Sequence, residues 1–290
     1  MNYFLVIIST VLSAIDMVLV KKYQTREGAE LKSSLKFYML NGLFTGFFFF
    51  ALTGFKPEFS WFSVAMSFLM TVFVLSYSLI GFYVLKVGNM AMYSIFLMCG
   101  GMVLPYIFGL VFLNEPLTLL RVIGIITILI AVILSNKAKY SIKLSLFLLY
   151  IAVFVLNGFV SIVSKCHQID TPFISVGSTD FVMYAGLWKF ILSCIILPFV
   201  KEKPNNNKKA LFSAKDTILI IVCSTMFSGL AYMFQLIGAT TLPATVLYPI
   251  GSGGSIIFSA LAGRIFFKEK LSVYQIMSIA LCFIGTLLFL

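Results

Sequence analysis

The segment FKEKLS, at residues 267–272, places a glutamate between two lysines in a chain that is otherwise strongly apolar. A second interruption of the same kind, LNEPLT, occupies residues 113–118. Each interruption is short, and each separates two long apolar runs. The recurrence of one acid at the same place in the pattern indicates that the chain contains an internal repeat.

The apolar character of the whole chain excludes an ordinary soluble domain. Of its 290 residues, 61% are hydrophobic and 11% are charged, whereas soluble domains carry about 25% charged residues. About 20 apolar residues are needed to cross a bilayer as a helix. Runs of roughly this length follow one another at residues 2–20, 35–54, 61–85, 90–112, 118–136, 143–165, 176–200, 215–238, 242–264 and 271–290. We therefore expect an all-α integral membrane protein of ten transmembrane helices.

The net charge of +11 arises mainly from lysines that flank the apolar runs. Most Lys and Arg residues lie in the odd-numbered connections, and only Lys56, Arg121 and Lys165 flank the even-numbered ones. Anionic headgroups and the positive-inside bias explain this distribution, so we expect membrane lipid as a partner, and no nucleic acid. Taken alone, the positive-inside rule places both termini outside the cell.

The chain is poor in the residues that metal and catalytic centres require. Its five cysteines fall in or at the ends of apolar runs without a CxxC pair, which is typical of buried hydrophobes. His167 is the only histidine, so a multi-histidine metal centre is excluded. We expect no metal, no cofactor and no enzyme activity, because enzyme chemistry needs a cluster of acids, histidines or nucleophiles.

The first half of the chain aligns with the second. Gly100, Gly109, Phe112, Glu115 and Leu117 match Gly254, Gly263, Phe266, Glu269 and Leu271, and Val11, Leu12, Lys21 and Gln24 match Val155, Leu156, Lys165 and Gln168. Five helices per half is an odd number, so the second half must enter the membrane from the opposite side. Secondary transporters use such inverted repeats for alternating access to one central site. We predict two inverted five-helix repeats, at residues 1–140 and 141–290.

The two halves end in the same way, with a glycine-rich helix, a short turn containing glutamate and leucine, and a last helix. These stretches are MCGGMVLPYIFGLVFLNEPLTLLRVIGIITILIAVIL (98–134) and SGGSIIFSALAGRIFFKEKLSVYQIMSIALCFIGTLL (252–288). They resemble the EamA type of the drug/metabolite transporter superfamily over the whole chain. The resemblance implies ten helices around a central cavity, alternating access and no ATP-binding element. It also implies cytoplasmic termini, contrary to the lysine distribution.

Two ionisable side chains within the apolar runs are the first candidates for a binding site. A charge inside a membrane helix costs roughly 2.5–3.5 kcal/mol on insertion scales, so a function is its default explanation. Lys189 lies near the middle of the run at 176–200, and Asp16 lies in the run at 2–20. We predict that Asp16 and Lys189 interact, recognising a charged substrate or coupling transport to protons. A purely structural polar contact is the alternative.

Uncharged polar residues supply further candidates. Ser13 and Asn157 occupy matching positions of the repeat, and Ser161 follows Asn157 by about one helical turn. Equivalent positions of inverted halves face each other across the pseudo-axis, so we expect these residues to line a shared cavity. Asn41, in the second run, is a candidate on the same grounds. Hydrogen bonding between helices is the alternative for all four residues.

The glycine-rich fourth helix of each half is expected to form a mobile wall of the cavity. Pro249 and the neighbouring glycines interrupt the run at 242–264, and interrupted helices often line the substrate site of transporters. Tyr248 and Ser252 share one face of this helix, and Tyr93 lies in its counterpart. Close packing of small residues is the alternative explanation.

Aromatic and amide side chains complete the candidate substrate site: Tyr77, Trp188, Tyr232 and Gln235. Aromatic residues in apolar helices are more often core or interface residues. Gln235 is a stronger candidate, because an amide in the middle of an apolar helix needs a polar partner.

Glu115 and Glu269 are expected to be structural. Both precede the last helix of a half, where a carboxylate can accept hydrogen bonds from free backbone N–H groups and suits the helix dipole.

These features together predict a secondary active or facilitative transporter in the cell membrane. Its expected substrate is a small polar metabolite, such as an amino acid or a sugar derivative. The alternative is a flippase for a lipid-linked sugar or a polyprenyl carrier, a task that some superfamily members perform. Either a monomer or a homodimer is compatible with the sequence.

Overall fold

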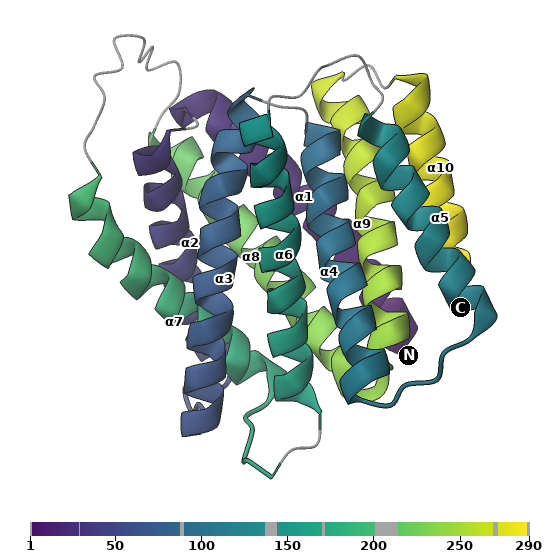
Figure 1. The fold of residues 1–290 in the computed structure, drawn as a ribbon. Helices are drawn as coiled ribbons and strands as arrows, with labels where there is room; N and C mark the ends of the chain where they lie inside the picture. The colour runs from purple at the N-terminus through teal and green to yellow at the C-terminus, as the bar shows by residue number, and fades with distance from the viewer. Residues whose placement is uncertain are drawn as a thin grey trace.

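A computed structural model of the chain describes residues 2–28, 30–87, 90–136, 144–169, 172–200, 214–268 and 272–288. These residues form ten α-helices and one turn of 3-10 helix at Leu197–Phe199, with no strand among them (Figure 1). The helices of the first half are α1 (Asn2–Glu27), α2 (Leu31–Leu52), α3 (Trp61–Val87), α4 (Met90–Phe112) and α5 (Leu119–Asn136). Those of the second half are α6 (Leu144–Gln168), α7 (Ser178–Ile196), α8 (Ala214–Thr241), α9 (Ala244–Phe267) and α10 (Val273–Leu287).

The helices follow the apolar runs, because a helix satisfies every backbone polar group within one segment when no water is present. Eight of them are long and apolar enough to cross a membrane. The apolar parts of α5 and α10 are shorter, at Leu119–Ala131 and Val273–Leu287. At 1.5 Å per residue, the 15 residues of α10 span about 22 Å, less than the roughly 30 Å of a bilayer core.

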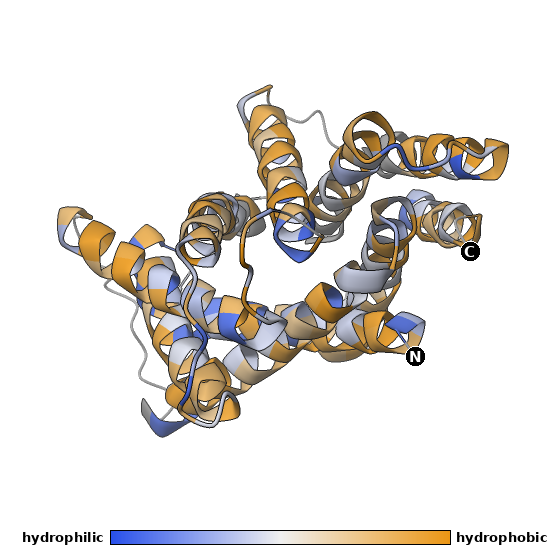
Figure 2. Ribbon diagram, turned by 90° about the horizontal axis from the view of Figure 1, so that it is seen from below, coloured by the Kyte–Doolittle hydropathy of each residue, from blue (hydrophilic) through white to orange (hydrophobic). Residues whose placement is uncertain are grey.

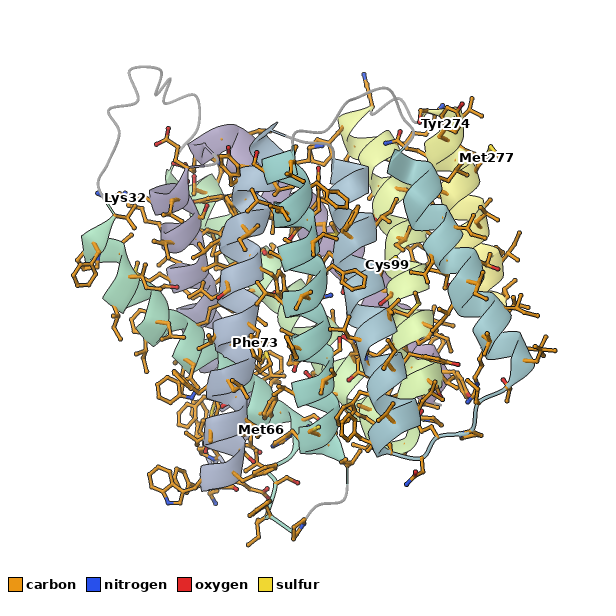
Figure 3. The ribbon with its side chains drawn as sticks, viewed as in Figure 1. Lys32, Met66, Phe73, Cys99, Tyr274 and Met277 are labelled. Carbon is orange, nitrogen blue, oxygen red and sulfur yellow. The ribbon has the colours of Figure 1, made fainter. Side chains whose placement is uncertain are left out.

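Consecutive helices alternate in direction, and both termini lie at the same end of the bundle (Figure 1). The α2–α3, α4–α5, α6–α7 and α8–α9 connections lie at this end, which we call the even end. Lys32, in the first turn of α2, lies at the opposite, odd end (Figure 3). The side chain of Thr217 donates to Glu27 Oε1 over 2.9 Å, which joins the end of α1 to the start of α8 and fixes these helices as antiparallel.

Most of the large helix contacts join a helix of the first half to a helix of the second half. Helix α1 packs on α8 and α9, just as α6 packs on α3 and α4. The remaining large contacts also join the first five helices to the last five: α2 with α7, α4 with α9, and α5 with α10. The core is therefore built mainly from contacts between halves.

Most of the ribbon is hydrophobic (Figure 2), and many large hydrophobic side chains are exposed, among them Phe47, Leu119 and Ile265. Tyr274 and Met277 project from α10 and are about half exposed (Figure 3). Such a surface suits lipid, and the chain is a multi-pass membrane protein.

The crossing of α2 and α7 is close because glycine lies on both helices. A Cβ atom at Gly42 would lie 2.5 Å from the backbone nitrogen of Phe190. A Cβ atom at Gly186 would lie 2.6 Å from the backbone nitrogen of Gly46. This approach brings Asn41 of α2 against Lys189 of α7.

Candidate functional site

A cavity of about 250 Å³ lies at the centre of the bundle. Its lining comes from α1–α4 of the first half and α6–α9 of the second. Most of the predicted site residues line it: Ser13, Asp16, Tyr77, Asn157, Ser161, Lys189, Tyr232, Gln235, Tyr248 and Ser252. Residues far apart in the sequence are thus brought to one polar space inside an apolar bundle.

Asp16 and Lys189 are the two charged residues in this lining, among the residues that the structure describes. They face the same cavity from α1 and α7. Between these two described residues there is no direct ion pair, which corrects the simplest form of the prediction. The Asp16 carboxylate accepts from the Ser224 hydroxyl, and Lys189 Nζ donates to Asn41 Oδ1 over 3.1 Å.

Asn41 does not line the cavity, but it contacts Lys189 and helps to position it. Its Nδ2 donates to Thr225 Oγ1 over 3.1 Å, while its Oδ1 accepts from Lys189. Because Ser224 and Thr225 are consecutive residues of α8, this helix contacts both the acid and the partner of the base. The two charges are therefore positioned by one shared polar network.

A second set of hydrogen bonds connects α6 to its neighbours around the cavity. Asn157 Nδ2 donates to the carbonyl oxygen of Leu97 over 2.7 Å, and the Tyr248 hydroxyl donates to that of Ser161 over 2.6 Å. The hydroxyls of Ser164 and Tyr232 lie 2.5 Å apart. These bonds supply the interhelical role that the sequence offered as the alternative for Asn157, and the same residues also face the cavity.

Tyr93 and Trp188 were predicted site residues but do not line the cavity. Tyr93 is buried against Gly81 of α3, in a cluster with Phe96. Trp188 Nε1 donates to the carbonyl oxygen of Val64 over 3.2 Å. Both aromatic side chains therefore take part in contacts between helices.

The predicted wall helices α4 and α9 do line the cavity, through Gly101, Tyr248 and Ser252 among others. Helix α9 runs from Ala244 to Phe267 with Pro249 inside it, so the proline and the glycines do not end the helix. Helix α4 likewise includes Pro105.

Sequence reasoning missed several hydroxyl residues of the lining: Ser9, Thr45, Thr71, Ser164, Ser228 and Ser255. A signal for some of them was present in the spacing. Ser9, Ser13 and Asp16 recur at intervals of four and three residues, and so do Asn157, Ser161 and Ser164. This spacing places each set on one face of a helix.

Glu115 is structural, as predicted, but it contacts a different helix from the one expected. Its Oε1 and Oε2 accept from the backbone nitrogens of Ala244 and Thr245, each over 2.8 Å, so it caps α9 of the other half. The start of α5 is served by Thr118, whose hydroxyl accepts from the backbone nitrogen of Arg121 over 3.4 Å. Glu269 lies outside the described residues, and α10 begins with a capping box between Ser272 and Gln275.

Comparison with known proteins gives a family match and a fold match. A model described as "EamA-like transporter family" matches residues 143–290. Among solved structures, 28 chains match. One of them, described only as "Crystal structure of protein", is similar with a TM-score of 0.72 over 99% of this chain and 94% of its own. Its sequence identity is 14%, so this likeness concerns the fold alone. No curated protein matches the chain.

Proposed function

The chain belongs to the EamA-like transporter family, and on this basis we propose that it carries a small polar metabolite across the cell membrane through its central cavity. The expected substrates are amino acids and sugar derivatives. The observation that carries the proposal is a polar cavity between the two halves, lined by one acid and one base.

The size and chemistry of the cavity support a small, polar and charged solute. Pockets for drug-sized ligands measure about 300–1,000 Å³, so a cavity of about 250 Å³ fits a small metabolite. Asp16 and Lys189 offer complementary partners for the ammonium and carboxylate groups of a zwitterion, and the serine, tyrosine and amide groups suit hydroxyls. Such charge-assisted hydrogen bonds are stronger than hydrogen bonds between neutral groups.

The architecture supports alternating access by two inverted five-helix repeats. Each major helix contact has a counterpart when the first five helices are exchanged for the last five. Equivalent helices run in opposite directions, as expected for repeats related by an axis in the membrane plane (Figure 1). We propose that α5 and α10, although short, complete a set of ten membrane-embedded helices.

Proton coupling is part of the proposal. Asp16 is the acid that lines the cavity among the described residues, and it lies near a base. A carboxylate that is exposed alternately to the two sides can take up and release a proton with each cycle.

The proposed function is tested by uptake and efflux in proteoliposomes. A panel of amino acids and sugar derivatives is measured with and without a pH gradient. Protein-dependent movement of at least one panel member is expected, and a pH gradient that drives accumulation supports proton coupling. Inertness to the whole panel, together with translocation of a lipid-linked sugar, would replace the proposal by the flippase.

A further inference from the structure

The two-residue connection between α8 and α9 is held by charged side chains from other parts of the chain. Lys165, near the end of α6, donates from Nζ to the carbonyl oxygens of Ala239 and Leu242 over 2.8 and 2.9 Å. Glu115, in the α4–α5 connection, accepts from the first backbone nitrogens of α9. The Lys165 ammonium group therefore caps the C-terminal end of α8, and the Glu115 carboxylate caps the N-terminal end of α9.

Both charges complement the helix ends that they contact. The last carbonyl groups of a helix carry partial negative charge, and the first N–H groups carry partial positive charge. Pro243, the residue at the N-cap of α9, provides no side-chain hydrogen bond to the helix. Glu115 supplies this missing cap from the other half of the molecule.

Arg121 connects the start of α5 to the start of α9, next to the same α8–α9 connection. Its Nη1 donates to Thr245 Oγ1 over 3.0 Å and to the carbonyl oxygen of Pro116 over 3.2 Å. We call the contacts of Glu115, Arg121 and Lys165 with the α8–α9 corner the corner clasp. Through Glu115 and Arg121, the clasp links the first half of the chain to the second.

The corner clasp lies at the end of the cavity. Ala239, whose carbonyl oxygen accepts from Lys165, lines the cavity, and so does Ser164. Tyr248, about one turn after Ala244, lines it as well. Lys165 is only 6% exposed and Thr245 is fully buried. The clasp thus lies directly between the cavity and the even end.

We propose that the corner clasp is the gate of the even end, which closes the cavity there in this conformation and breaks when the cavity opens to that side. The bonds suit a reversible gate. Helix-end N–H and C=O groups take no part in intrahelical bonds, so water can replace Glu115 and Lys165 without unwinding α8 or α9. The inference rests on the proposed transport function, but its test needs no substrate.

The test measures how fast a thiol in the cavity is labelled from the even end. Ala239→Cys is introduced into a variant without the five native cysteines, and sealed proteoliposomes are treated with a membrane-impermeant thiol reagent. Lys165→Met removes the cation, and Glu115→Gln replaces one of the two acceptor oxygens by an NH2 group, which cannot accept from a backbone N–H. Each change is expected to raise the labelling rate from the even end about tenfold or more, as the loss of charged hydrogen bonds implies.

Matched controls come from the same end of the molecule. Glu58→Gln and Lys56→Met alter exposed charges outside the clasp and are expected to keep the labelling rate within about twofold, as is usual for surface substitutions. Unchanged labelling in folded, inserted Glu115→Gln and Lys165→Met proteins would overturn the gate. Should Lys165→Met not fold, the isosteric Glu115→Gln, at a partly exposed position, decides the matter alone. Because labelling involves no solute, this result is separate from the outcome of the transport panel.

Discussion

At the scale of single residues, the chemistry of the cavity is set by two opposite charges that have separate hydrogen-bond partners inside an apolar bundle. Asp16 and Lys189 each have a neutral polar partner, Ser224 and Asn41, instead of each other. A direct buried ion pair would satisfy both groups and leave little reason to bind a ligand. Separate partners leave each charge able to attract the opposite charge of a solute.

We predict that Lys189→Met weakens transport of anionic or zwitterionic substrates. The loss of a charge-assisted hydrogen bond, worth about 1.5–3 kcal/mol, corresponds to roughly a 10- to 100-fold change. The measurement is kcat/KM for the best substrate in proteoliposomes. Lys56→Met, which removes an exposed lysine at the even end, is the control and is expected to transport normally.

We predict that Asn41→Ala raises KM about tenfold with little change in kcat. Asn41 touches Lys189 and not the cavity, so its loss leaves the lysine without its anchor and weakens binding in all states alike. Asn41→Asp, which would place a carboxylate directly against Lys189, is expected to raise KM as well, because the paired lysine binds a substrate anion more weakly. Equal KM values in the wild type and Asn41→Ala would show that Asn41 serves packing only.

Much of the cavity lining was predictable from the sequence because polar residues are few in apolar helices. Ser13, Asn157 and Gln235 were conspicuous for this reason, and all three reach the cavity. Their role in binding a substrate stays a prediction. The outward position of Trp188 was not predictable, because an aromatic ring suits lipid, core and cavity alike. The partner of Lys189 also depends on the distance between α2 and α7, which no local pattern encodes.

At the scale of helices, the close crossing of α2 and α7 is the contact that positions the site. Gly42 and Gly186 allow the two backbones to meet, and the adjacent Asn41 then reaches Lys189. Small residues serve the same purpose throughout membrane bundles, where close van der Waals packing replaces the hydrophobic effect.

We predict that Gly42→Ala destabilises the protein by about 1–3 kcal/mol, the usual cost of overpacking. The added methyl group would meet the backbone of α7, which cannot move aside as a side chain can. Unfolding in mixed micelles measures the effect. Gly251→Ala, whose Cβ would meet only Gln235 Nε2 at 3.5 Å, controls for the general change in helix propensity. Equal stability of the two variants would contradict the close crossing.

The glutamate of LNEPLT shows what an element-level pattern can and cannot predict. Its position before a helix correctly indicated a capping carboxylate. The sequence favoured the helix that follows, α5, whereas the carboxylate reaches α9. The actual partner is determined by the folding of the α4–α5 connection, in which Asn114 has a left-handed backbone with φ of 50°. Such a fold-back is a tertiary feature that helix-start signals do not contain.

At the scale of the whole molecule, the number and order of the helices were predictable, because apolar runs of bilayer length leave few alternatives. The ten predicted runs correspond to the ten observed helices. Their ends were less predictable, since α1 continues past its apolar run through Lys21 and Arg26 to Glu27. The packing of α5 on α10 at one edge of the bundle was not predicted either.

We predict that tags on the two termini are accessible from the same side of the membrane. The proposed ten crossings require this, and both termini lie at the even end of the bundle (Figure 1). Protease protection of tagged protein in sealed vesicles is the measurement, with a tag in the connection at residues 201–213 as the control for the opposite side. Tags on opposite sides would mean that α5 or α10 does not cross.

Exchange in proteoliposomes tests the central claim, carriage through one alternating cavity, most directly. Vesicles are loaded with an unlabelled solute that the protein transports, and the initial uptake of the labelled solute is measured. The account predicts that loading accelerates uptake by the wild type, because the substrate-bound cavity returns to the outside. It also predicts that Asp16→Asn and Lys189→Met each reduce the exchange strongly. Uptake that is insensitive to loading, or unchanged exchange in both variants, would contradict it.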